Sequence, residues 1–279
     1  IETDAIGADL TGSLVLASQP VAVFGGSEAS NAPNTEHCGA DGRCEWDADT
    51  PCVSNADCVS FNTCCADHLE QQLFPVKTWG KHYLAAKSFD RGGESDVWRI
   101  LASEDGTQIV TVPEQVSIPL LNAGEWFDFR SREHFEIMAT KPILVGQFLA
   151  AQDDPGPGRQ PNDAGIGDPA FILTVPTEQF RQDYVVLAPM HYELDYITLV
   201  APQDAAVVFD GAPVPEEAFE LFGTGQHRVA RFRIADGVHR LSADQPIAVY
   251  VYGFDVYVSY GYPGGLDLKA INAGAAEGL

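Results

Sequence analysis

The sequence predicts an all-β protein of tandem antiparallel, sandwich-like repeat units, with one disulfide-stapled loop and one short helix. Apolar and polar residues alternate along many segments, turn signals such as Asp-Gly separate these segments, and one segment pattern occurs three times. Alternation with a period of two is typical of half-buried strands, and short strands at regular spacing predict a sandwich or barrel. A propeller, with four strands in each blade of roughly 40 to 50 residues, is the alternative.

The composition is that of a folded and strongly acidic protein. The 279 residues are 45% hydrophobic, which disfavours disorder. No apolar run approaches the roughly 18 residues of a membrane helix, so we expect no membrane insertion. Sixteen Lys and Arg against 40 Asp and Glu give a net charge of −24. This charge would repel nucleic acid and anionic lipid, and neither is an expected partner.

A pattern beginning Ala-x-(Gln/Lys)-Pro occurs at residues 17–24, 139–146 and 243–250. Proline is tolerated at the first residue of a strand, and the β-branched residues after it point to one face. We therefore expect three core strands that each begin at the proline. The last two copies lie at the ends of longer matching segments. The aligned residues include Tyr83 with Tyr184, Asp96 with Asp195, and Pro142 with Pro246.

These matching segments set the predicted domain organisation. Residues 1–80 would hold the closing strand of an incomplete unit, a cysteine-rich loop at 38–65 and a short helix. The other predicted divisions are a β unit at 81–150, a Gly/Pro/Asp-rich loop and linker strand at 151–181, a second β unit at 182–268 and a tail at 269–279. The helix is expected at 67–73, because Asp67 and Glu70 have the spacing of a capping box and Pro75 would end it.

The cysteines indicate the compartment. All six fall within 28 residues, at Cys38, Cys44, Cys52, Cys58, Cys64 and Cys65. An even, clustered set predicts three disulfides and an extracellular or cell-surface location. Zinc is the alternative, but a zinc site would need closely spaced Cys or His pairs, and the gaps here are five, seven, five, five and zero residues. The adjacent Cys64 and Cys65 are expected to take different partners, because a ring between neighbours is strained.

No catalytic residue is predicted, and no cofactor is expected to be required. The seven histidines form no His-Glu-x-x-His motif, and the chain has no Gly-x-Ser-x-Gly elbow. Four arginines, Arg228, Arg231, Arg233 and Arg240, fall within 13 residues. Pairing with nearby carboxylates is the simpler interpretation of this group, and a docking patch for an acidic partner is the alternative.

The acidic loop that begins at residue 151 is the one segment with a predicted ion site. It carries four carboxylates, Asp153, Asp154, Asp163 and Asp168. Calcium prefers several oxygen ligands on flexible loops, so these residues are the predicted calcium ligands. Solvated surface carboxylates are the alternative.

Several motifs occur in the same order as in a known family. They are Asp67-His68-Leu69-Glu70-Gln71, Trp79-Gly80, Trp98-Arg99-Ile100-Leu101-Ala102, Gly167-Asp168-Pro169-Ala170, Pro176-Thr177-Glu178-Gln179-Phe180 and Gly261-Tyr262-Pro263-Gly264-Gly265. In this succession the chain resembles the N-terminal domain family of IgGFc-binding protein. The resemblance implies an extracellular, non-enzymatic binding or adhesion module, and it brings no catalytic residue with it.

The cysteine-rich loop departs from that family, which usually has a short loop before the Asp-His pair. The spacing Cys-x5-Cys-x5-Cys-Cys looks like half of a whey-acidic-protein module, but the two further cysteines of that module are missing. We interpret the segment as an enlarged stapled loop. The expected partner is an extracellular protein or glycan, with binding residues unknown. A structural subunit that self-associates through β edges is the alternative function, and an enzyme of unknown chemistry is a further one.

Overall fold

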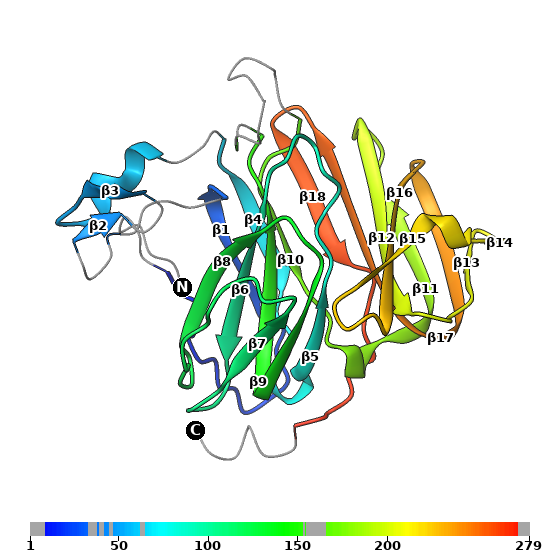
Figure 1. Cartoon of the computed structure of the whole chain (residues 1–279), viewed down its shortest axis with the longest axis horizontal. Coiled ribbons are helices and arrows are strands. Elements are labelled where there is room, and N and C mark those ends of the chain that lie inside the picture. The colour runs from blue at the N-terminus through cyan, green and yellow to red at the C-terminus, as the bar shows by residue number, and fades with distance from the viewer. Residues whose placement is uncertain are drawn as a thin grey trace.

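The computed structural model describes residues 9–32, 38, 42–44, 47–61, 65–152, 154 and 166–272. This part of the chain is mostly antiparallel β-sheet, as the sequence predicts, and its helices are short 3-10 turns (Figure 1). None of the helices found there is long and apolar enough to cross a membrane.

The first β unit is defined here as β5 to β10. Its strands are β5 (Gly80–Ala85), β6 (Asp96–Ala102), β7 (Ile109–Val112), β8 (Trp126–Ser131), β9 (Phe135–Leu149) and β10 (Ala170–Leu173). The long strand β9 is central. Its residues 135–139 pair with β5 and β7, and its residues 143–149 pair with β6 and β10. The two halves of β9 therefore pair with different strands of one six-stranded sheet.

The second β unit is defined as β11 to β18. Its strands are β11 (Arg181–Ala188), β12 (Leu194–Pro202), β13 (Val207–Phe209), β14 (Ala212–Pro213), β15 (Phe219–Phe222), β16 (His227–Ile234), β17 (Gly237–Asp255) and β18 (Val258–Pro263). The long strand β17 is central in the same way. Its first part pairs with β11 and β13, and residues 248–255 pair with β12 and β18.

The repeated prolines lie inside the two central strands. The expectation that a strand begins at each proline is therefore wrong for Pro142 and Pro246. Both prolines lie in the gap where the central strand changes from one pair of partner strands to the other, so the missing N–H interrupts no ladder there. The expectation is also wrong for the copy at residues 17–24. Residues 17–23 form no strand, and β1 (Phe24–Ser30) begins only at the end of that copy.

The predicted helix at 67–73 is wrong, because Asp67–Gln72 is the strand β4. It pairs antiparallel with β1, and its burial alternates, with Leu69 buried between the exposed His68 and Glu70. An isolated helix of two turns is marginal in water, whereas pairing with β1 satisfies the backbone along the segment. The helical segments that do occur are η1 (Asn55–Phe61), η2 (Val76–Thr78), η3 (Thr177–Gln179) and η4 (Glu216–Ala218).

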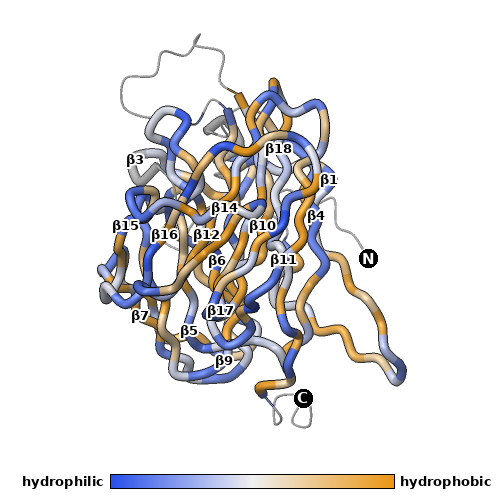
Figure 2. Tube along the Cα trace, turned by 90° about the vertical axis from the view of Figure 1, so that its right-hand side faces the viewer, coloured by the Kyte–Doolittle hydropathy of each residue, from blue (hydrophilic) through white to orange (hydrophobic). Residues whose placement is uncertain are grey.

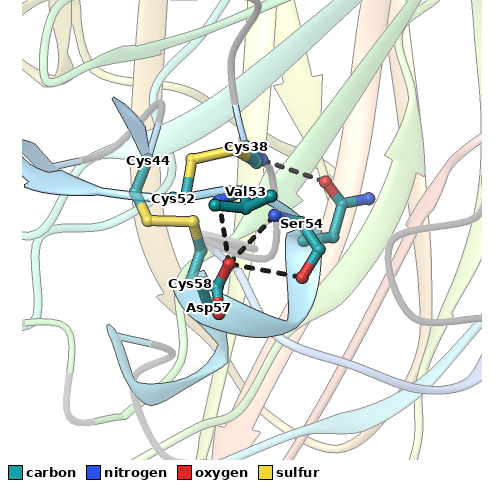
Figure 3. Close-up of a disulfide and its surroundings, with 8 residues drawn as sticks. Cys38, Cys44, Cys52, Val53, Ser54, Asp57 and Cys58 are labelled. Atoms are coloured by element: carbon teal, nitrogen blue, oxygen red, sulfur yellow. Dashed lines mark hydrogen bonds between the residues drawn. A yellow bond between two sulfur atoms is a disulfide. The ribbon is translucent and has the colours of Figure 1, made fainter. Parts of the chain in front are cut away.

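The cysteine-rich loop carries β2 (Arg43–Cys44), β3 (Asp47–Pro51) and η1. Disulfides join Cys38 to Cys52 and Cys44 to Cys58 (Figure 3). Cys65 is also disulfide-bonded, while Cys64 lies outside the described residues. The expectation that Cys64 and Cys65 take different partners depends on Cys64 and therefore stays a prediction.

Three large apolar clusters form most of the core. One lies inside the first unit and includes Trp98, Phe135 and Ile137. Another lies inside the second unit and includes Ile197, Leu241 and Val251. The third joins the two units and contains Leu84, Ala86 and Ile172 from the first with Tyr196, Tyr252 and Phe254 from the second. The two units therefore pack against each other through this third cluster.

Candidate functional site

A buried polar cluster stands at the junction of the two units. The Asp96 carboxylate accepts hydrogen bonds from the Ser88 N–H (2.8 Å), the Ser88 hydroxyl (2.7 Å) and the Gln147 amide (2.6 Å), and the Lys87 ammonium lies 3.1 Å from it. All four side chains are buried. These partners compensate for the burial of the Asp96 charge. Because all four side chains are buried, a substrate in solvent does not reach the cluster.

Several hydrogen bonds connect the first unit to the second at this junction. Arg231 donates to the carbonyl oxygen of Ser88 at 2.9 Å, and the N–H of Phe89 donates to the Tyr252 hydroxyl at 2.9 Å. The Glu136 carboxylate accepts the Thr224 N–H at 2.7 Å. These contacts join the first unit to the second.

The exposed face of interest is the outer side of β11 and the first part of β17. On β11 the side chains of Tyr184 and Val186 point into the core, while Val185 and Leu187 are 59% and 53% exposed. Leu187 lies opposite Val238 of β17, which is also exposed. The side chains of Val185, Leu187 and Val238 therefore face solvent side by side, and we call this surface the β11 face. Figure 2 looks onto the end of the molecule that carries β11, β14 and β17.

The β11 face is hollowed beside Val185. The hollow measures about 490 Å³ and is shallow. Its lining is Arg181, Asp183, Tyr184, Val185, Val208, Gly211, Arg240, Leu241 and Ser242. Two guanidinium groups at an apolar patch suit a partner with a carboxylate and apolar side chains. The hollow is too shallow to enclose a small molecule, so its shape favours a protein surface.

The free edge of β11 is closed to a further strand near Leu187. The Tyr262 hydroxyl accepts the Leu187 N–H at 2.8 Å and donates to the Leu187 carbonyl oxygen at 2.6 Å. A strand that added here would need the same backbone groups. At this position of β11 the side chains are open to contact, and the backbone edge is not.

The predicted calcium ligands are only partly described. Asp153 and Asp163 lie outside the described residues. The Asp154 carboxylate is paired with the Arg130 guanidinium, and the Asp168 carboxylate accepts the Cys65 N–H at 3.4 Å. Burial raises the pKa of Asp168. Both described carboxylates already have partners in the protein, and the calcium site stays a prediction.

The clustered arginines are mostly engaged within the protein. Arg228 binds the Ala205 carbonyl oxygen at 2.7 Å and pairs with Glu216. Arg231 joins the two units, and Arg233 donates to a backbone carbonyl. Only Arg240 of the four lines the hollow. Intramolecular pairing is thus the observed arrangement for the other three.

Sequence reasoning missed the β11 face. Its signal was the unbroken apolar run at residues 184–188, since a strand with one buried face should alternate. Such a run indicates a strand with two covered faces. Here one of those faces is exposed.

Comparison with known proteins places the chain in a family. The family model described as IgGFc binding protein matches residues 5–253. No curated protein sequence matches the chain. A solved structure described as an anti-sigma factor domain-containing protein is 10% identical to this chain. The match covers 66% of this chain and 81% of the other, and its TM-score of 0.19 is too low to indicate a shared fold. Because the family match spans nearly the whole sequence, the chain belongs to the IgGFc-binding protein family.

Proposed function

We propose that the chain is an extracellular, non-enzymatic binding or adhesion module, and that its β11 face binds an extracellular protein. Membership of the family supports a binding role, and the two described disulfides fit an oxidising compartment. The observation that carries the proposal is the exposure of Val185 and Leu187 on the same side of β11.

The chemistry of the β11 face suits a protein partner. Burying a fully exposed Val or Leu side chain contributes about 1.5 to 3 kcal/mol, and Val185 and Leu187 each still have a little over half of that surface to cover. Arg181 and Arg240 flank it and can each bind a carboxylate with two hydrogen bonds. An apolar centre with a charged rim is the usual anatomy of a protein interface.

The test is a binding screen of the intact chain against arrays of extracellular proteins and glycans. Wild-type chain is expected to bind a protein, and Leu187→Asp and Val185→Asp are expected to weaken that binding at least tenfold. Val110→Asp is the matched control, because Val110 is 56% exposed on β7 of the first unit. Melting curves show that each variant is folded.

Equal binding by all three variants would place the partner elsewhere and contradict the proposed face. Binding to glycans only would make the partner a carbohydrate, which was the other expectation from the sequence, and would contradict the protein partner.

A further inference from the structure

The segment that leads into β1 repeats a feature of the two central strands. In each place the N–H just after a neighbouring strand donates to a valine carbonyl oxygen three residues after the repeated proline. The donors and acceptors are Leu73 and Val23 at 2.8 Å, Thr174 and Val145 at 2.9 Å, and Gly264 and Val249 at 2.7 Å. The neighbouring strands are β4, β10 and β18, which pair antiparallel with β1, β9 and β17. Residues 21–30 therefore correspond to the second halves of β9 and β17.

The first half of this further copy is unpaired in the part of the chain that the structure describes. In β9 the residues before the proline pair with β5, and in β17 they pair with β11. Residues 14–22 form no strand, and they make no backbone–backbone hydrogen bond to another described residue. Figure 1 draws them within the dark-blue trace that leads into β1. Their N–H and C=O groups are therefore available to a further strand.

The side chains of this segment are also uncovered where their counterparts are core. Val15 lies five residues before its proline and Val21 lies one residue after it. The exposed fractions are 55% for Val15 against 0% for Ile137 and 3% for Leu241, and 62% for Val21 against 0% for both Ile143 and Ile247. The positions that the two units bury are therefore on the surface here.

The segment is apolar and carries no charge. Residues 10–27 include no Asp, Glu, Lys or Arg, although 20% of the whole chain is charged. Leu14 and Leu16 are exposed as well. A contiguous apolar surface of this kind marks a site of interaction, and an extended backbone with free hydrogen-bonding groups recruits a strand.

The two units show what covers this stretch. In each, a tyrosine lies opposite the counterpart of Val15, and its hydroxyl donates to the carbonyl oxygen of the counterpart of Val21. Those tyrosines are Tyr83 and Tyr184. All nine tyrosines of the chain lie at residues 83–262, within the two units. The chain has no further tyrosine for this place, so the covering strand comes from another polypeptide.

We propose that residues 14–22 take up an extended strand of another polypeptide, with a tyrosine opposite Val15 whose hydroxyl donates to the carbonyl oxygen of Val21. Main-chain hydrogen bonds would supply affinity, and the tyrosine would fix the register. This inference goes beyond the proposed function, because the segment is separate from the β11 face.

Calorimetric titration of the full chain with a peptide tests the contact. The probe is a synthetic peptide with the sequence of residues 80–87, the strand that covers β9. Wild type is expected to bind it with a dissociation constant below roughly 1 mM. Tyr83→Phe in the peptide should weaken binding by about three- to tenfold, because it removes one hydrogen bond.

Variants of the chain locate the contact. Val15→Asp should weaken peptide binding by roughly tenfold or more, because it puts a charge against the tyrosine. Val15 is exposed, so this variant is expected to melt as wild type does. Val110→Asp and Leu187→Asp should bind the peptide as wild type does. Amide hydrogen exchange should show slower exchange at residues 14–22 when the peptide is bound.

A wild type that does not bind the peptide would overturn the inference, as would binding that leaves exchange at residues 14–22 unchanged. Equal binding of the two peptides would overturn the role of the tyrosine. Self-association that Val15→Asp abolishes and the peptide does not compete with would make the occupant a second copy, and would also overturn the inference. Because Leu187→Asp tests the β11 face separately, the proposed function can fail or hold independently of these results.

Discussion

The hydroxyl of Tyr184 donates a hydrogen bond of 2.6 Å to the carbonyl oxygen of Ile247, and the hydroxyl of Tyr83 bonds to the carbonyl oxygen of Ile143. In both cases the hydroxyl also accepts the N–H of the residue three positions earlier. Burial raises the pKa of Tyr184 to about 12 and raises that of Tyr83 further. Each tyrosine ties an outer strand to the middle of its central strand.

Removing either hydroxyl should destabilise the fold. Tyr184→Phe and Tyr83→Phe each leave a buried carbonyl and a backbone N–H without this partner, and we expect each to lower the free energy of unfolding by about 1 to 3 kcal/mol. Urea unfolding measures the change. Tyr257→Phe, at an exposed position, should leave the midpoint unchanged. Equal stability of Tyr184→Phe and wild type would show that the shared hydrogen bond contributes nothing.

Acidification should loosen the junction of the units through His134. Its Nδ1 accepts the Lys87 N–H at 3.0 Å, which requires the neutral ring, and its Nε2 lies 3.0 Å from Glu220. Burial and the nearby Arg231 lower the pKa of His134 to about 4, although Glu220 opposes them. The unfolded chain takes up this proton near pH 6.5, so it binds more protons than the folded chain between these values.

Stability is therefore expected to fall as the pH falls from about 6.5 to about 4, by roughly 1 to 3 kcal/mol from this group. Urea unfolding at a series of pH values measures the slope. His134→Gln should flatten the slope in this window, and the exposed His68→Gln should keep it. A slope that is the same in His134→Gln and wild type would assign the acid sensitivity to other groups.

The disulfides should stabilise the cysteine-rich loop. Each described bridge spans 14 residues, and closing a loop of this length contributes about 3 kcal/mol. The double variant Cys44→Ser/Cys58→Ser should be cleaved in this loop by protease faster than wild type. Thiol titration of the denatured, unreduced chain is expected to find no free thiol, and two or more per chain would contradict the predicted three bridges.

Calcium, if it binds the acidic loop, should raise the melting temperature. A ligand at a hundredfold excess over its dissociation constant stabilises the folded state by about 2.7 kcal/mol. We expect wild type to melt higher in calcium than in chelator, and Asp154→Asn/Asp163→Asn to lose that difference. Each chain is compared with itself, because Asp154 also pairs with Arg130. A wild-type melting temperature that is the same in calcium and in chelator would contradict calcium binding at this loop.

The all-β architecture could be predicted because alternation records which face of a strand is buried. The strand at β4 could not, because its backbone partner β1 lies about 40 residues earlier and no local pattern reports it. The role of Pro142 was misread for the same reason. A proline pattern shows that a ladder bond is missing, and only the pairing shows that the strand continues past the proline to pair with other strands.

The β11 face is harder to predict from the sequence than the strands are. Val185 and Leu187 have the character of buried residues, and their exposure depends on which surfaces the whole chain brings together. The hydrogen bonds at the junction are likewise formed by residues far apart in the chain, such as Glu136 and Thr224. The division of the chain at 81–150 and 182–268 stays a prediction.

Because β9 and β17 each pair with four other strands, they have a mechanical consequence. Pulling either strand out would break hydrogen bonds on both of its edges and along both of its halves at once. A sheet of this kind cannot be peeled one strand at a time from its centre. Under tension between a surface and a bound partner, each unit would therefore stay folded until it unfolded cooperatively, in one step.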